Sequence, residues 1–182
     1  MIIAIAGLHG TGKSTIANLL AKNLGILYYS TGQAFRDLAT ENNMSLEEYT
    51  HFVEKHPDID KELDNKVVQM AKKGSIVIDS QLSGHMLKTI ANFKIQLTCP
   101  LEVRVKRMAA RDQTSYEEKL KETTIREKSE LDRFKKLYNI DLSDEESAKE
   151  FFDFIINTES LSVEEVLGII LKELERIKPN DF

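Results

Sequence analysis

The sequence predicts an α/β fold in which a five-stranded parallel sheet carries helices on both of its faces. Five short apolar runs of strand length alternate with longer segments of helical periodicity. The length of 182 residues suits one domain, since domains commonly hold about 100–200 residues. With 41% hydrophobic and 30% charged residues, the composition is that of a globular chain rather than a fibrous or disordered one. We therefore expect a single domain over residues 1–182.

The first predicted strand, Ile2–Ala6, is short, rich in isoleucine and ends at a glycine, as a buried parallel strand does. Apolar residues at helical spacing follow over 15–24, and Gly25 ends that helix. The other four strands are expected at 26–29, 75–79, 93–97 and 152–156. Further helices are expected after Ser30 and Ser45 and over 59–72, 100–111, 115–138 and 163–177.

Several of these helices begin at a serine followed three residues later by a glutamate. This spacing forms a capping box, in which the hydroxyl and the carboxylate bind the free amides of the first turn. The four pairs are Ser45 with Glu48, Ser115 with Glu118, Ser143 with Glu146, and Ser162 with Glu165.

The segment after the first strand has the spacing of a phosphate-binding loop. It reads Gly7-Leu8-His9-Gly10-Thr11-Gly12-Lys13-Ser14, followed by Thr15, and so matches G-x-x-x-x-G-K-[ST] without a break. Glycines let the backbone curl so that successive amides point at phosphate oxygens, and the next helix adds its positive N-terminus. Lys13 can reach the β- and γ-phosphates, and the Ser14 hydroxyl can bind Mg²⁺. His9 has no evident partner, and we interpret it as a loop position.

A small kinase is the kind of P-loop protein that fits best. A regulatory GTPase would carry N-K-x-D and D-x-x-G motifs, but Asn65-Lys66 lacks the aspartate and no D-x-x-G occurs. A motor or helicase would need a longer chain. When the phosphoryl acceptor is itself a phosphate, the reaction needs charge neutralisation rather than a general base.

Arginines at helical spacing could supply that neutralisation. Arg104, Arg107 and Arg111 share one helix face, and Arg126 with Arg133 share another. Arginine grips phosphate oxygens through two parallel N–H groups, so we expect Arg107, Arg126 and Arg133 to act with Lys13 in catalysis. The alternative interpretation is two solvated helix faces.

Two further strand ends carry candidate ligand-binding residues. Asp79 ends the third strand, where it could hold Mg²⁺ together with Ser14 or cap a helix instead. Ser30-Thr31-Gly32 ends the second strand and opens a helix bearing Arg36, which suits a second anionic ligand. The alternatives are ordinary capping by Ser30 and a surface position for Arg36.

With these residues placed, the chain resembles the short, archaeal-type cytidylate kinases, a family of nucleoside monophosphate kinases. The matching stretches beyond the P-loop are 30–39 (STGQAFRDLA), 44–49 (MSLEEY), 58–64 (DIDKELD), 107–112 (RMAARD), 126–127 (RE), 133–141 (RFKKLYNID) and 156–158 (INT). The resemblance implies a P-loop NTPase fold with a monophosphate-binding insertion at about 31–73 and a lid at about 107–133. It implies that ATP and Mg²⁺ convert CMP or dCMP to the diphosphate, with Ser30, Gly32 and Arg36 at the monophosphate.

One segment departs from that family. Its members commonly read Glu-Gly-Arg-Leu after the third strand, with the arginine near the acceptor, whereas this chain reads Asp79-Ser80-Gln81-Leu82. Gln81 occupies the acceptor-binding position without the positive charge. The acceptors AMP, UMP, dephospho-CoA and shikimate therefore stay open, as does a nucleotide-binding module without turnover. Asn139 also replaces a usual glycine, although Asn tolerates the left-handed conformation.

Charge and cysteine content exclude other classes. A net charge of −5 and a pI near 5.5 argue against nucleic-acid and anionic-membrane binding. A lone cysteine, Cys99, rules out an internal disulfide and fits a reducing compartment. We expect a cytoplasmic enzyme, monomeric or weakly dimeric, whose partners are the small molecules ATP and CMP or dCMP.

Overall fold

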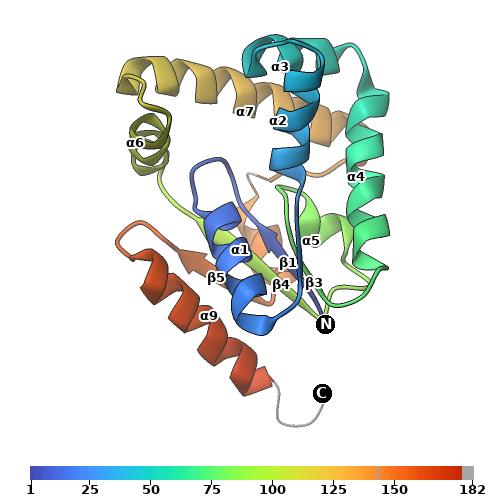
Figure 1. The fold of residues 1–182 in the computed structure, drawn as a ribbon, viewed down its shortest axis with the longest axis vertical. Helices are drawn as coiled ribbons and strands as arrows, with labels where there is room; N and C mark the ends of the chain where they lie inside the picture. Colours follow the sequence, from blue (N-terminus) through green and yellow to red (C-terminus); the bar gives the residue numbers. More distant parts are fainter. Residues whose placement is uncertain (143, 178–182) are drawn as a thin grey trace.

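The computed structural model describes residues 1–142 and 144–177, and its centre is a parallel sheet of five strands (Figure 1). The strands are β1 (Ile2–Ala6), β2 (Leu27–Ser30), β3 (Ile76–Asp79), β4 (Phe93–Thr98) and β5 (Phe154–Asn157), in the spatial order β2-β3-β1-β4-β5. All four pairings are parallel. The predicted fold class is confirmed, and each predicted strand lies within two residues of the observed one.

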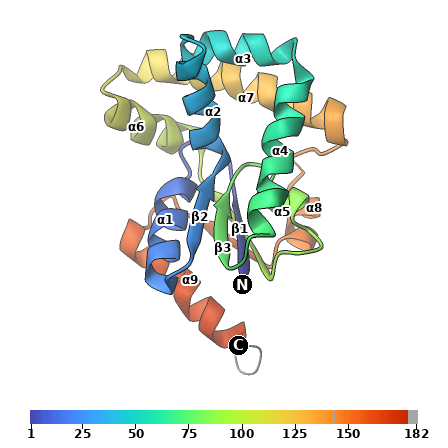
Figure 2. The ribbon, with the colours of Figure 1, turned by 45° about the vertical axis from the view of Figure 1, so that its right-hand side comes forward.

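Helices cover both faces of this sheet. They are α1 (Lys13–Leu24), α2 (Thr31–Glu41), α3 (Leu46–Glu54), α4 (Pro57–Ala71), α5 (Ser83–Met86), α6 (Leu101–Asp112), α7 (Tyr116–Tyr138), α8 (Glu145–Phe151) and α9 (Val163–Ile177). Figure 2 shows α1 and α9 on one face, with α4, α5 and α8 on the other. The sequence did not predict α5, because four residues are too few to display a helical period. For α8 it predicted only a helix start, from the spacing of Ser143 and Glu146.

Three of the predicted helix N-termini are capped by serine and glutamate side chains. Ser45 and Ser115 make complete capping boxes with Glu48 and Glu118. Ser162 and Glu165 exchange the same pair of hydrogen bonds at the start of α9. The predicted capping box of Ser143 with Glu146 cannot be compared in this way, because Ser143 lies outside the described residues. Asn139 takes the left-handed conformation at the end of α7, with φ 56°.

Three apolar clusters hold these layers together. The largest packs α1 and α9 against one face of the sheet, and includes Ile5, Leu20 and Ile170. A second packs α4 against the other face through Val67 and Ile78. The third lies within the α2–α4 segment and has no residue from the sheet. That segment therefore has a small core of its own.

The arrangement places loops and helices above the carboxyl ends of the strands. The P-loop follows β1, which lies between β3 and β4. Strands β2 and β3 lie on one side of β1 and strands β4 and β5 on the other, so the strand order reverses at β1. Open α/β sheets bind ligands at such a switch point. In Figure 1 the helices α2, α3, α6 and α7 stand over this end of the sheet. Among the described residues, no helix has the length and apolar character needed to cross a bilayer.

Candidate active site

The P-loop backbone is curled between β1 and α1. Gly10 and Gly12 have φ angles of 78° and 92°, which side-chain-bearing residues rarely adopt. A Cβ atom on Gly10 would also lie 2.7 Å from the carbonyl oxygen of Arg104. No side chain caps the first turn of α1, so its free amides are open to an anion.

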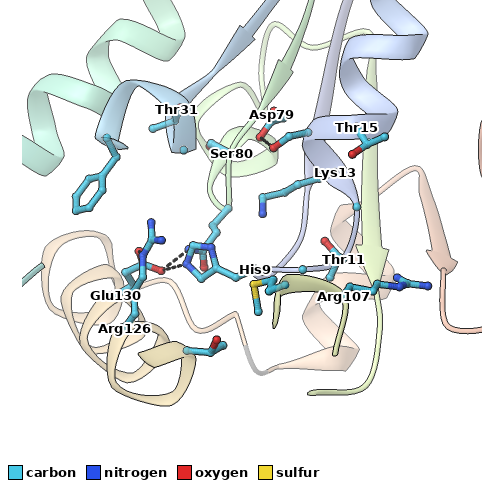
Figure 3. Close-up of a pocket in the computed structure, with 18 of the residues that line it drawn as sticks. His9, Thr11, Lys13, Thr15, Thr31, Asp79, Ser80, Arg107, Arg126 and Glu130 are labelled. Carbon is cyan, nitrogen blue, oxygen red and sulfur yellow. Dashed lines mark hydrogen bonds and ion pairs between the residues drawn. The ribbon is translucent and has the colours of Figure 1, made fainter. Parts of the chain in front are cut away.

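Lys13 points from the start of α1 into the cavity, below Asp79 in Figure 3. Its Nζ donates to the carbonyl oxygen of Leu8 at 3.1 Å, folded back along the loop. Burial lowers the pKa of the Lys13 ammonium below its ordinary value, although the carboxylates of Asp79 and Glu130 oppose that shift. A phosphate would replace the carbonyl with a full negative charge, which is a stronger partner.

Asp79 and Ser14, both expected at a metal ion, lie next to each other. The Ser14 hydroxyl donates to Asp79 Oδ1 at 3.2 Å, and the Tyr28 hydroxyl donates to Asp79 Oδ2 at 2.6 Å. Burial and the nearby Asp79 carboxylate raise the pKa of Tyr28 to about 12, so this hydroxyl keeps its proton. Asp79 caps no helix, which removes the alternative interpretation of this residue. Tyr28 was not predicted.

These oxygen atoms fit a divalent cation that takes most of its ligands from phosphates and water. Magnesium prefers that environment, with one or two protein oxygen ligands. No group of three or more His, Cys, Asp or Glu side chains within residues 1–142 and 144–177 forms an all-protein metal site.

The cavity has a volume of about 760 Å³, towards the upper end of the usual range for ligand pockets, about 300–1,000 Å³. Its floor is the P-loop and its walls come from α2, α4, α7 and the segment after β3. The predicted site residues Gly32, Arg36 and Gln81 line it together with Lys13. Ser30 instead accepts a hydrogen bond from the Gln33 amide and caps α2, as the alternative interpretation proposed.

Positive charges converge on this cavity. Arg36, Arg111, Arg126 and Lys13 all line it. Burial lowers the pKa of Arg36, and the charges of Arg126 and Arg111 lower it further. Arg126 has the same effect on the pKa of Lys13. A polyanion between these side chains would relieve their mutual repulsion.

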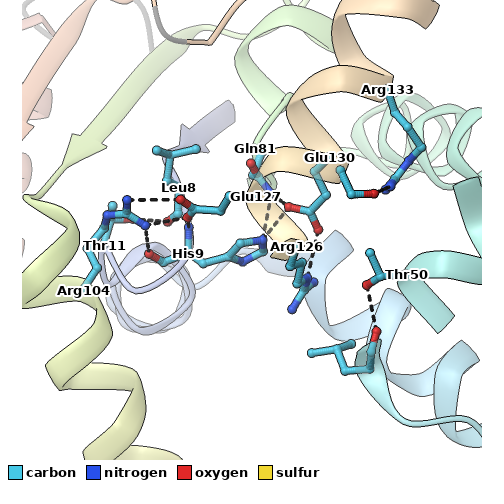
Figure 4. Close-up of polar contacts among 12 residues, drawn as sticks. Leu8, His9, Thr11, Thr50, Gln81, Arg104, Arg126, Glu127, Glu130 and Arg133 are labelled. Atoms are coloured by element: carbon cyan, nitrogen blue, oxygen red, sulfur yellow. Dashed lines mark hydrogen bonds and ion pairs between the residues drawn. The ribbon is translucent and has the colours of Figure 1, made fainter. Parts of the chain in front are cut away.

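The interpretation of His9 as a loop position without a partner is wrong. Its Nε2 lies 2.6 Å from Glu130 Oε2 on α7, and Gln81 Nε2 donates to the same carboxylate oxygen at 2.5 Å (Figure 4). Arg126 Nε donates to Glu130 Oε1 at 3.0 Å. Burial alone would raise the pKa of Glu130, but Arg126 and the hydrogen bonds from His9 and Gln81 hold it below its ordinary value. Glu130 therefore joins the P-loop, the segment after β3 and the predicted lid.

A second contact fastens the same end of the P-loop to α6 and α7. Arg104 is 4% exposed, and its guanidinium binds Glu127 through two nitrogens. It also donates to the His9 carbonyl at 2.8 Å, while Glu127 accepts from the His9 amide at 3.2 Å. Arg104 therefore holds the loop in shape, and does not share one ligand-binding face with Arg107 and Arg111.

Arg107 and Arg133 line the cavity with their guanidinium groups already engaged. Arg107 donates to the hydroxyl and the carbonyl of Thr158 at 3.0 and 2.6 Å, and in Figure 3 it points away from Lys13. Arg133 donates from Nε to Asp60 Oδ2 at 2.7 Å. Arg126 is also ion-paired, to Glu130, but of the three expected catalytic arginines it is the one whose charge acts on Arg36 and Lys13.

Buried carboxylates lie at the end of the cavity formed by α4. Asp60 and Asp64 are one turn apart, 6% and 9% exposed, and both line the cavity. The Tyr138 hydroxyl donates to Asp64 Oδ2 at 2.6 Å. Sequence reasoning missed this group, because acidic residues four apart on a charged helix also occur on solvated faces. The signal that could have found them is their position on the same face as Leu63 and Val67.

We predict that Asp64→Asn stabilises the protein at neutral and alkaline pH. Burial raises the pKa of Asp64 from 3.8 to about 6. Above pH 6 the folded protein therefore holds a buried, ionised Asp64 carboxylate, which lowers the free energy of unfolding. The penalty is absent below the unfolded pKa and complete above the folded one. Asparagine can still accept the Tyr138 hydrogen bond.

The gain in unfolding free energy should be about 3 kcal/mol at pH 8 and about half of that at pH 5, from a pKa shift of about 2 units at about 1.4 kcal/mol per unit. Urea unfolding at the two pH values measures it. A gain that is the same at both pH values, or a loss at pH 8, would contradict the burial argument.

Proteins similar to this chain are known in sequence and in fold. A family model described as an AAA domain matches residues 3–135. A cytidylate kinase of Staphylothermus marinus is 39% identical over 97% of both chains, and one of Ignicoccus hospitalis is 40% identical over 95% of this chain and 98% of its own.

Solved structures of similar fold include a shikimate kinase from Acinetobacter baumannii, with a TM-score of 0.63 and 16% identity over 98% of this chain and 95% of its own. An uncharacterized protein from Eubacterium ventriosum gives a TM-score of 0.68 at 18% identity over 96% of this chain and 98% of its own. At such identities these structures support the fold alone.

Proposed function

Because this chain belongs to the cytidylate kinase family, we propose that its cavity holds ATP and CMP together and that the phosphoryl group passes directly between them. The reaction transfers the γ-phosphoryl group of ATP to a phosphate oxygen of CMP and yields ADP and CDP. We propose dCMP as a second acceptor, giving dCDP. The attacking oxygen is already an anion, so no side chain has to remove a proton from it.

On the donor side, we propose that the P-loop from Gly7 to Thr15 binds the ATP phosphates. The amides of Gly10, Thr11 and Gly12 and the free amides of α1 would surround the β-phosphate, and Lys13 would contact the β- and γ-phosphates. Ser14 would hold Mg²⁺ together with Asp79, directly or through water. Bound there, Mg²⁺ would supply neutralisation of the phosphate charge.

On the acceptor side, we propose that Arg36 and the first turn of α2 at Gly32 hold the monophosphate, with Ser30 shaping that turn and Gln81 beside the nucleoside. Arg126 is the arginine best placed to contact the transferred group. Arg107 would have to exchange its Thr158 contacts for a phosphate oxygen. Arg133, which is paired with Asp60, would contact the acceptor nucleotide.

The observation that carries this proposal is the convergence of four cationic side chains with the Ser14–Asp79 pair in one cavity. Such a site favours a polyanion accompanied by a divalent cation. Turnover rather than mere binding is favoured because Lys13 lies beside this pair and Arg126 on the opposite wall. We further propose that the enzyme acts in the cytoplasm as a monomer or weak dimer, without a nucleic-acid or membrane partner.

The test is ADP release by the purified protein with ATP and Mg²⁺ against a panel of acceptors. The panel holds CMP, dCMP, UMP, AMP, dephospho-CoA and shikimate. We expect ADP release with CMP and dCMP at rates at least ten times those of the other acceptors. Binding of ATP without ADP release above background for every acceptor would instead identify a nucleotide-binding module.

A further inference from the structure

Asp60 on α4 and Arg133 on α7 form a buried ion pair at the end of the cavity away from the P-loop. The two residues are 6% and 8% exposed, and Asp60 Oδ2 accepts from Arg133 Nε at 2.7 Å. Arg133 Nη1 donates to the Ser129 hydroxyl at 2.6 Å. Asp60 Oδ1 and Arg133 Nη2 make no hydrogen bond to any residue in 1–142 or 144–177. One acceptor atom of Asp60 and one donor atom of Arg133 are thus without a partner in that part of the chain, and both residues line the cavity.

A buried ion pair is a poor source of stability, because removing both charges from water costs about as much as their attraction returns. The direction of the Asp60 pKa agrees: burial raises it even though Arg133 lies in contact. A pair that contributes little to stability and keeps a free hydrogen-bonding edge towards a cavity has the features of a recognition site.

The cavity has further polar atoms that no other described residue satisfies. The hydroxyl oxygens of Thr31 and Ser80 and the side-chain carbonyl oxygen of Gln81 are buried, and none has a hydrogen-bond partner in the described part of the chain. Ser80 is 5% exposed, and all three side chains line the same cavity. Buried polar groups in native proteins are normally paired, so these atoms are available to hydrogen-bond a polar ligand in the cavity.

The surroundings of the ion pair suit a flat ring. Phe35, Leu63 and Phe134 line the cavity with it and provide apolar surface for the faces of an aromatic base. Arg133 follows Arg126 by seven residues on α7, which is about 10 Å along a helix. That separation is on the scale of one nucleoside, so a monophosphate held near Arg126 and Arg36 can extend its base towards Arg133.

We propose that Asp60 and Arg133 recognise the base of the acceptor and select cytosine over uracil, an inference that rests on the proposed function. The pairing edge of cytosine presents two acceptors, O2 and N3, beside the N4 amino donor. The free N–H of Arg133 can donate to the acceptors, and Asp60 Oδ1 can accept from the amino group. Uracil carries a carbonyl oxygen at position 4, which would face the carboxylate with two acceptors in contact. A site whose buried groups are left unpaired by the wrong base rejects it strongly.

The first experiment changes one atom of Asp60. In Asp60→Asn the amide oxygen stays on Arg133 and the NH₂ group turns to the base, where it can donate to uracil O4 and opposes the cytosine amino group. Initial rates with CMP and UMP at saturating ATP should show the ratio of kcat/KM for CMP over UMP falling at least 100-fold, with UMP turnover retained or raised. Glu62→Gln is the matched control, since it makes the same change at an exposed position of α4 outside the cavity and should leave the ratio unchanged.

The second experiment needs no variant, and so does not depend on how Asp60→Asn folds. The unaltered protein is given either CMP or an analogue of CMP in which cytosine is replaced by pyrimidin-2-one. This analogue lacks only the 4-amino group. We expect kcat/KM to fall at least about 100-fold for the analogue. Equal kcat/KM for the two acceptors would overturn the proposal, as would equal losses for CMP and UMP in an Asp60→Asn protein that melts near the wild-type temperature.

These results are distinct from failure of the proposed function. If the kinase proposal itself fails, the unaltered protein phosphorylates neither CMP nor the analogue. If base recognition alone fails, CMP is phosphorylated well and the analogue equally well.

Discussion

Lys13→Ala should lower kcat/KM for CMP phosphorylation at least about 10³-fold while leaving the fold intact. Lys13 is the P-loop side chain that can place a full positive charge at the γ-phosphate, and a pre-positioned charge of this kind is worth several kcal/mol to the transition state. The fold should survive because the Lys13 ammonium donates to the Leu8 carbonyl, and the Thr11 hydroxyl donates to that same oxygen at 2.9 Å. Alanine is also the best helix former for the first position of α1.

Coupled ADP release and a thermal melt measure the two halves of this prediction. Lys22→Ala provides the control, since Lys22 is an exposed lysine on the same helix and its removal should change neither readout. If Lys13→Ala kept activity within a few-fold of wild type, the P-loop would not be the catalytic phosphate site.

Arg126→Ala should lower kcat by about 10²–10³-fold and raise the KM for ATP much less. Arg126 Nε donates to Glu130 Oε1 at 3.0 Å, and its guanidinium carbon lies 5.3 Å from the centroid of the Phe35 ring. A contact that strengthens as charge moves between the two nucleotides is lost mainly from kcat. Arginines in this role contribute about 10³–10⁵-fold in other phosphoryl transfers.

Two variants separate this role from general effects of charge. Arg126→Lys keeps the charge but loses the planar pair of donors, and should recover only part of the rate. Lys128→Ala removes an exposed cation from α7 and should leave kcat unchanged. If Arg126→Ala kept the wild-type kcat, Arg126 would have only a structural role, through its ion pair with Glu130, and no role in the reaction.

The sequence contained enough information to place the sheet and the phosphate loop. Short apolar runs such as Ile2–Ala6 predict their own secondary structure, and the glycines at 10 and 12 permit the positive φ angles that the structure shows. The meeting of Ser14 and Asp79 followed from a general rule, that the carboxyl ends of parallel strands share one edge.

The side-chain pairs that complete the cavity could not be predicted in this way. His9 and Glu130 are 121 residues apart in the chain, and Asp60 and Arg133 are 73 apart. Each member alone fits an exposed loop or a solvated helix face, because local periodicity does not show which helix packs against which loop. The contacts depend on α7 crossing over the P-loop and α4, which is a property of the tertiary arrangement.

The central claim is that ATP and CMP occupy one cavity at the same time and that the phosphoryl group passes directly between them, with no covalent phosphoenzyme intermediate. Initial rates over a grid of ATP and CMP concentrations test it directly. We expect double-reciprocal lines that intersect, as a ternary complex requires. Parallel lines, together with a protein labelled by the γ-phosphate of ATP in the absence of CMP, would contradict it.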